Sequence, residues 1–303
     1  MTAELDLTGA VDANSRGLWG GLVINGFAPI NDCPANVEGG TAQCTKEGEA
    51  ESGLFGGDQP ADSSGRLNYL VVKYAGNGVD SQNQLNGIAF QGVGSGTEVD
   101  YIQVHNNFDD GVEFFGGTVD VKHVILTGNN DDSMDWTDGW VGRAQYVHID
   151  QQGAGDNGIE ADNRDGGFDN LPRSAPDIAN MTIVASSDNR AVRLRHGTAG
   201  RIFKAVLGGS SSTDKAALCL RVDDRSQDFV GTDIILDEVA MDCTAIAEGT
   251  GVQAYLDGAN VTQDGSAPAT QATLPADGFF EANSTLGSGV EEWGAGWSFG
   301  LGL

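Results

Sequence analysis

Asp110-Gly111-Val112-Glu113-Phe114 is one copy of a five-residue pattern that decides the fold of this chain. The pattern consists of a polar residue, a small residue, an apolar residue, a variable residue and a second apolar residue. Its other copies are Asn86-Gly87-Ile88-Ala89-Phe90, Asp132-Ser133-Met134-Asp135-Trp136, Asn157-Gly158-Ile159-Glu160-Ala161, Arg190-Ala191-Val192-Arg193-Leu194 and Ala216-Ala217-Leu218-Cys219-Leu220. Successive copies begin roughly 22 to 33 residues apart, which is the periodicity of a solenoid.

A second apolar strand follows each of the first five copies after a glycine-rich turn, as in Tyr101-Ile102-Gln103-Val104. One coil cannot bury its own apolar side chains, so neighbouring coils must stack with parallel strands about 4.8 Å apart. The recurring leucine frame of leucine-rich repeats is absent. The sequence therefore predicts an all-β fold, a right-handed parallel β-helix that forms a single domain over residues 1–303.

Three segments depart from the repeat. Residues 31–63 form a Gly/Asn/Glu-rich insertion, and residues 162–176 account for the longest interval between copies. Residues 266–303 lose the pattern but collect aromatic residues, from which we expect a C-terminal cap. At the other end, residues 16–24 already read as a strand, so the alternative of an adhesin-like solenoid with further coils upstream stays open.

Four cysteines fall into two local pairs, Cys33 with Cys44 and Cys219 with Cys243. The even number and the lack of zinc-motif spacing favour disulfides formed in an oxidising compartment. Cys243 follows Cys219 by about one coil, so a bridge between adjacent coils is reasonable. Cys33 and Cys44 would close a short loop within the first insertion.

The net charge of −28 excludes the usual basis of nucleic-acid binding, which is the neutralisation of phosphates by cationic side chains. It also disfavours anionic membrane surfaces. No apolar run is long enough to span a membrane, and the first residues lack the features of a signal peptide. We expect an extracytoplasmic protein whose signal sequence is absent from this chain.

The chain resembles a group of bacterial exported β-helix proteins, associated with the outer membrane or cell surface and often of unassigned function. The resemblance rests on Arg16-Gly17-Leu18-Trp19-Gly20-Gly21-Leu22, on the segments around Asp110 and Asp132, and on Trp293-Gly294-Ala295-Gly296-Trp297. It extends to the pectin-lyase-like superfold, which includes polysaccharide lyases, glycoside hydrolases and phage tailspikes. It implies a fold and export, but no catalytic residue.

An acidic column is the main candidate site. If the apolar positions of the pattern point inward, its fourth position points outward, which gives the column Ala89, Glu113, Asp135, Glu160, Arg193 and Cys219. Stacked carboxylates repel one another unless a proton or a cation neutralises them. The column therefore predicts a calcium site at Glu113, Asp135 and Glu160, with a solvated acidic face as the alternative.

Further polar residues lie beside the column in turns and in the second insertion, where long loops often form the walls of a binding site. The candidates for ligand binding are Asp138, Trp140, Asp162, Arg164 and His196.

The most direct functional interpretation is a non-catalytic protein that binds a glycan or a protein partner of the cell surface, with calcium as its cofactor. The alternative is a polysaccharide lyase or glycoside hydrolase with Glu113, Asp135, Glu160, Arg193 and Arg195 as catalytic candidates. Arg195-His196-Gly197 and the Asp109-Asp110 pair are faintly similar to polygalacturonase motifs, but their separation spans nearly three coils.

Overall fold

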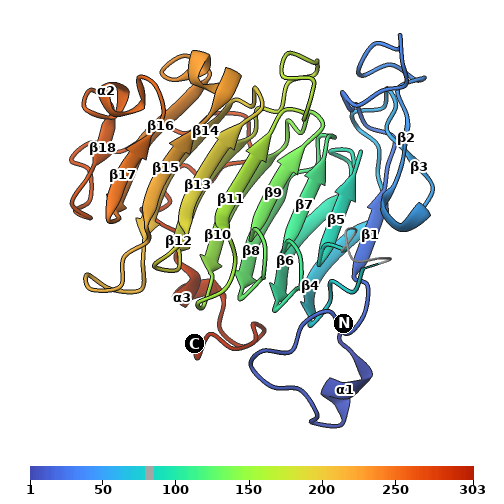
Figure 1. The fold of residues 1–303 in the computed structure, drawn as a ribbon, viewed down its shortest axis with the longest axis horizontal. Coiled ribbons are helices and arrows are strands. Elements are labelled where there is room, and N and C mark those ends of the chain that lie inside the picture. Colours follow the sequence, from blue (N-terminus) through green and yellow to red (C-terminus); the bar gives the residue numbers. More distant parts are fainter. Residues whose placement is uncertain (79–84) are drawn as a thin grey trace.

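The computed structural model describes residues 1–78 and 85–303 and shows a parallel β-helix of two eight-stranded sheets. Each coil adds one strand to each sheet, and every pairing within the two sheets is parallel. Figure 1 shows the strands stacked side by side along the long axis of the molecule. The predicted β-helix is therefore confirmed.

The first sheet carries the five-residue pattern. Its strands in spatial order are β1 (Leu22–Asn25), β5 (Ile88–Gln91), β7 (Val112–Phe115), β9 (Met134–Thr137), β11 (Asn157–Asp162), β13 (Arg190–Arg195), β15 (Leu218–Val222) and β17 (Ala245–Glu248). The second sheet consists of β4 (Arg66–Lys73), β6 (Glu98–His105), β8 (Val121–Thr127), β10 (Arg143–Asp150), β12 (Asp177–Val184), β14 (Gly200–Gly208), β16 (Ile234–Asp242) and β18 (Asn260–Thr262).

The space between the two sheets is filled by apolar side chains. The third and fifth positions of the pattern point inward, as expected, and Ile88, Phe90 and Phe114 have no exposed surface. The rings of Phe90 and Phe114 stack at 5.1 Å between centroids, and Trp140 stacks on Phe114 at 3.9 Å. Stacked like residues thus form the core, because each coil places its side chains over those of the next.

Both predicted disulfides are present. Cys219 and Cys243 join adjacent coils with a Cα–Cα distance of 5.5 Å, and Cys33 and Cys44 close the loop in the first insertion at 4.6 Å. This insertion also contains the short antiparallel pair β2 (Lys46–Glu47) and β3 (Leu54–Phe55) and the 3-10 helix η1 (Glu49–Glu51). A second 3-10 helix, η2 (Asp224–Phe229), follows β15.

The far end of the β-helix is closed by helix α2 (Val252–Leu256), next to β17 and β18 (Figure 1). Val252 and Leu256 are buried in the core, and the Tyr255 hydroxyl accepts a hydrogen bond of 2.7 Å from the Leu236 amide. The expected cap at residues 266–303 is therefore misplaced. A five-residue helix with two apolar side chains covers the last coil instead.

Residues 266–303, which we call the C-terminal strap, run back along the outer face of the second sheet. The strap begins near β16, where the Ala272 amide donates to Glu238, and ends near β6, where Phe299 exchanges two hydrogen bonds with Gln103. Helix α3 (Val290–Trp293) lies within it. The aromatic residues of the strap therefore cover a sheet and not an end.

The strap packs on a column of residues whose backbone is left-handed, with φ between 49° and 63°. The members of this left-handed column are Tyr69, Tyr101, His123, Tyr146, Asn180, Lys204 and Glu238. Each lies at the same position of its strand, where the parallel register skips one residue. The first four rings stack in succession at 4.2 to 4.9 Å between centroids.

The N-terminal segment, with helix α1 (Glu4–Leu7), lies beside the first coil of the β-helix (Figure 1). The Lys73 amide donates to the Met1 carbonyl, and Lys73 also pairs with Asp6 at 2.6 Å. None of the helices in residues 1–78 and 85–303 is long and apolar enough to cross a membrane.

One buried ion pair lies within the left-handed column, and both of its members also contact the strap. Lys204, only 2% exposed, contacts Glu238 and the Ser284 carbonyl, both at 3.0 Å. We expect Lys204→Met to lower the free energy of unfolding by about 3–5 kcal/mol in urea titrations, because it leaves the Glu238 carboxylate buried without its cationic partner.

Two further variants test this interpretation. Adding Glu238→Gln to Lys204→Met removes the unpaired charge and should restore most of the loss. Lys122→Met breaks a pair whose partner Glu281 is 59% exposed, so it should cost at most about 1 kcal/mol. Equal losses in the two single variants would contradict the buried pair.

Candidate functional site

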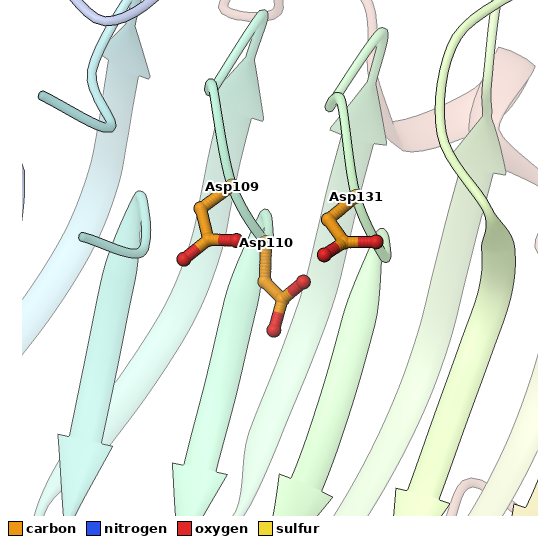
Figure 2. A group of neighbouring side chains, drawn as sticks. All are labelled: Asp109, Asp110 and Asp131. Atoms are coloured by element: carbon orange, nitrogen blue, oxygen red, sulfur yellow. The ribbon is translucent and has the colours of Figure 1, made fainter. Parts of the chain in front are cut away.

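Eight carboxylates form a continuous acidic cluster on the outer face of the first sheet and in the turns that lead into β7, β9 and β11. Its members are Asp109, Asp110, Glu113, Asp131, Asp132, Asp135, Asp156 and Glu160. They form overlapping groups of three in which the closest carboxylate oxygens lie within 4.8 Å of one another. Figure 2 shows one such group, with Asp110 between Asp109 and Asp131.

The strand register produces part of this cluster directly. Glu113 pairs with Asp135, Asp135 pairs with Glu160, and Glu160 pairs with Arg193 on successive strands. The predicted stacking of three carboxylates beside one guanidinium is confirmed. Glu113 and Asp135 are half-buried, and Glu160 is 7% exposed.

The predicted register of the last copy of the pattern is wrong. Arg193 pairs with Arg221 and not with Cys219, and Arg221 pairs in turn with Glu248. Cys219 has no exposed surface and is part of the buried core. It lies two residues before Arg221, which occupies the outward position that we expected for Cys219. The apolar residues on both sides of Cys219 make the two registers hard to distinguish, but only the observed one places the disulfide inside the β-helix.

The turn aspartates have two roles. The Asp110 carboxylate accepts a hydrogen bond of 2.9 Å from the Asp132 amide, and Asp132 accepts one of 2.7 Å from the Asn157 amide. These bonds hold the corners of successive coils, the structural role that Asx residues have in turns. The same geometry places both carboxylates inside the acidic cluster, which the sequence analysis did not anticipate.

A ninth carboxylate, Glu49, reaches the cluster from helix η1 in the first insertion. Asn86 donates to Glu113 at 2.6 Å and to Glu49 at 3.2 Å, and Gln91 donates to Glu49 at 3.2 Å. The insertion therefore lies over the first rungs of the column. Sequence analysis missed Glu49, because the insertion has no period that would fix its register against the sheet.

The pKa values of the clustered carboxyls are raised. Burial is the largest cause for Asp110, Glu113 and Asp135, and repulsion by neighbouring carboxylates adds to it. The same two causes raise the pKa of Asp109 to about 6 and that of Glu49 to about 7. At neutral pH the cluster therefore holds negative charge at a cost in free energy, or it holds protons.

Ion pairs neutralise only one end of the cluster. Arg193 contacts Glu160 at 3.1 Å, and Arg195 contacts both Glu160 and Asp162, the latter at 2.8 Å. His196 contacts Asp162 at 3.0 Å. In the described part of the chain, Glu49 forms no ion pair, and neither do six members of the cluster. These six are Asp109, Asp110, Glu113, Asp131, Asp132 and Asp135.

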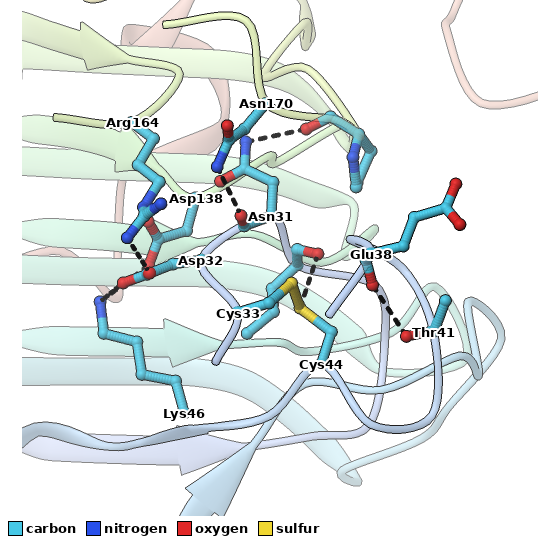
Figure 3. Close-up of a disulfide and its surroundings, with 12 residues drawn as sticks. Asn31, Asp32, Cys33, Glu38, Thr41, Cys44, Lys46, Asp138, Arg164 and Asn170 are labelled. Atoms are coloured by element: carbon cyan, nitrogen blue, oxygen red, sulfur yellow. Dashed lines mark hydrogen bonds and ion pairs between the residues drawn. A yellow bond between two sulfur atoms is a disulfide. The ribbon is translucent and has the colours of Figure 1, made fainter. Parts of the chain in front are cut away.

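The two insertions join beside this site (Figure 3). Asp32 pairs with Arg164, and Lys46 pairs with Asp32 at 2.7 Å and with Asp138 at 3.1 Å. Across the same junction, the Asn170 side chain donates to the Asn31 carbonyl, and the Asn31 side chain donates to the Pro172 carbonyl. The second insertion therefore supports the first, which carries Glu49.

Three members of the predicted ligand-binding set are engaged within the protein itself. Trp140 has no exposed surface, and its indole donates to the Val119 carbonyl, so a ligand cannot reach it. Asp138 is 3% exposed and is engaged by Lys46. Arg164 is engaged by Asp32. The structure places Asp162 and His196, with Arg195, at the end of the cluster.

The donor atoms fit a hard divalent cation. Carboxylate and amide oxygens at this density are the ligands that Ca²⁺ prefers. One oxygen each of Asp135, Asn86 and Gln91 is inaccessible to solvent and accepts no hydrogen bond. A cation bound between the carboxylates would relieve the repulsion between them.

Residues 5–298 match a family described as pectate-lyase-like β-helix domain. The chain belongs to this family. The match spans nearly the whole β-helix, the acidic cluster and the strap, and it agrees with the predicted relation to the pectin-lyase-like superfold. Searches of curated proteins and of solved structures found no match.

The raised pKa values predict how stability depends on pH. A carboxyl whose pKa is higher in the folded than in the unfolded state lowers stability as pH rises between the two values, here from about pH 4 to about pH 7. Asp135→Asn removes one such charge. Without divalent cations, it should raise the melting temperature at about pH 7.5 and change it little at about pH 4.

The control is Glu248→Gln, which lies on the same outward column but pairs with Arg221 and is 58% exposed. Its effect on the melting temperature should be small at both pH values. Burial lowers the pKa of His105 to about 4, so this residue makes stability rise with pH. Its contribution is the same in the wild type and in both variants, so it cancels in the comparison. A lower melting temperature for Asp135→Asn at neutral pH would contradict the repulsive cluster.

Proposed function

We propose that this protein is an exported, non-catalytic polysaccharide-binding protein whose acidic cluster holds Ca²⁺ and presents it to an acidic polysaccharide. One observation carries the proposal: six carboxylates of the cluster lie in groups within 4.8 Å and have no basic partner among the described residues. Such an arrangement is costly for the protein alone and favourable once a cation is bound.

The arrangement of charge supports a cation-mediated contact. A chain with a net charge of −28 repels a polyuronate, unless a bound cation coordinates carboxylates from both sides. Asp131 and Asp156 are the exposed members of the cluster, so a ligand would approach on their side. Arg193 and Arg195 lie at the same end, where they can add hydrogen bonds to a bound sugar chain.

The pairing of the arginines argues against a lyase. β-Elimination needs a base that accepts a proton from the sugar ring. Asp162 and Glu160 raise the pKa of Arg195 and keep it protonated. Hydrolysis remains the second candidate function, because the raised pKa values of Glu49 and Asp109 are those of groups that can donate a proton near neutral pH.

Export is supported by the two disulfides, which form and persist in oxidising compartments.

Calcium titration by isothermal calorimetry tests the proposal directly. We expect wild-type protein to bind Ca²⁺ and to gain about 2.7 kcal/mol in stability at a calcium concentration one hundred times the dissociation constant. Glu113→Gln and Asp135→Asn should each weaken binding about tenfold or more, and Glu248→Gln should leave it unchanged. Absence of calcium binding at millimolar concentration would overturn the calcium site.

The polysaccharide contact is tested with a panel of acidic and neutral polysaccharides, with and without Ca²⁺. We expect acidic members to bind only with Ca²⁺, and we expect no new reducing ends and no absorbance from unsaturated products. Calcium-independent binding would contradict cation mediation. New reducing ends that disappear in the Glu160→Ala variant would establish the hydrolase instead.

A further inference from the structure

A cavity lies on the second sheet, between the strap and strand β10. It has a volume of about 400 Å³. Its lining includes Tyr146 from the left-handed column together with residues 281–285, 288, 289, 292 and 293 of the strap. The cavity therefore exists only because the strap crosses the sheet here, and it shares no residue with the acidic cluster.

The rings at this cavity are held in place. Tyr146 stacks on His123 at 4.9 Å, and its hydroxyl donates to Glu281 at 2.9 Å. The indole of Trp293 donates to the Ser288 carbonyl at 2.7 Å and packs edge-on against His123 at 5.0 Å. Two preorganised aromatic side chains thus line one cavity.

The charge of the lining has one sign. Glu281 and Glu292 contribute carboxylates, and none of the residues that line the cavity is basic. Glu281 is engaged by Tyr146 and by Lys122, whose ammonium lies 3.3 Å away. The Glu292 carboxylate forms neither an ion pair nor a hydrogen bond with any described residue. Glu292 is therefore the cavity carboxylate that has no partner among the described residues.

We propose that this cavity binds an organic cation that carries an alkylammonium group. Aromatic faces attract ammonium groups through the ring quadrupole, and a carboxylate beside them adds a direct ion pair. The ammonium group would pair with Glu292 and contact the rings of Trp293 and Tyr146. Asn283 and Ser284 line the same cavity and offer polar groups to the rest of the molecule.

Other ligand classes fit the lining less well. An anion would meet two carboxylates without a basic side chain in the cavity. A divalent metal ion needs a larger set of oxygen ligands than Glu281 and Glu292 supply, and Glu281 is already engaged. A neutral sugar could stack on the rings, but it would leave the Glu292 charge unused. Comparing a cation with its uncharged isostere separates these two ligand classes.

The experiment compares choline with 3,3-dimethylbutan-1-ol, its uncharged isostere, by calorimetry and ligand-observed NMR on the whole chain at low ionic strength. We expect choline to bind with a dissociation constant in the millimolar range and the isostere to bind at least about threefold more weakly. Glu292→Gln should weaken choline binding about threefold to fivefold.

Glu291→Gln is the matched control. Glu291 neighbours Glu292 in helix α3 and is exposed, but it does not line the cavity. The two variants remove the same charge from adjacent surface positions, so a difference between them reports on the cavity and not on net charge. Glu291→Gln should bind choline as the wild type does.

Three results would overturn the proposal. They are the absence of choline binding by folded wild-type protein, equal affinity for choline and its uncharged isostere, and equal effects of Glu292→Gln and Glu291→Gln. Binding of the isostere alone would assign the cavity to a neutral ligand. The calcium titration is independent of all three, because the acidic cluster lies on the other sheet.

Discussion

Parallel stacking of the coils is the constraint on which the rest of this structure depends. Because each coil lies directly over the next, every side chain has a counterpart about one strand spacing, roughly 4.8 Å, away. The same constraint stacks Phe90 on Phe114 in the core, places Tyr101 over His123 on the second sheet, and aligns Glu113 with Asp135 on the first. Aromatic residues gain from such repetition, whereas carboxylates are forced together by it.

The acidic cluster therefore follows from the fold, because the sequence places carboxylates at stacked positions of successive coils. Its two ends differ. At one end Arg193 and Arg195 neutralise Glu160, and at the other end Glu49, supplied by an insertion, adds further negative charge. Substituting an uncharged residue for Asp135 would remove one source of this repulsion. The protein is thus a β-helix with a densely acidic surface, beside which two insertions meet at Asp32 and Arg164.

The repeating features of the structure could be predicted from the sequence, and the non-repeating features could not. The strands, the inward apolar positions, the stacked carboxylates and the Cys219–Cys243 disulfide follow from a period that can be read along the chain. The register of Cys219 failed because apolar residues flank it on both sides. Glu49, the burial of Trp140 and the path of the strap depend on contacts between distant, non-repeating segments, and no local pattern specifies these.

The strap also changes how the coils of the β-helix depend on one another. In a simple solenoid each coil touches only its neighbours, so an end can fray without disturbing the rest. Here one segment contacts the second sheet from Glu238 in β16 to Tyr69 in β4, and its Phe299 lies against Lys73 of the first coil. The chain's last residues thereby secure its first strands. Opening either end disturbs contacts made at the other, which turns a linear array of coils into one cooperative unit.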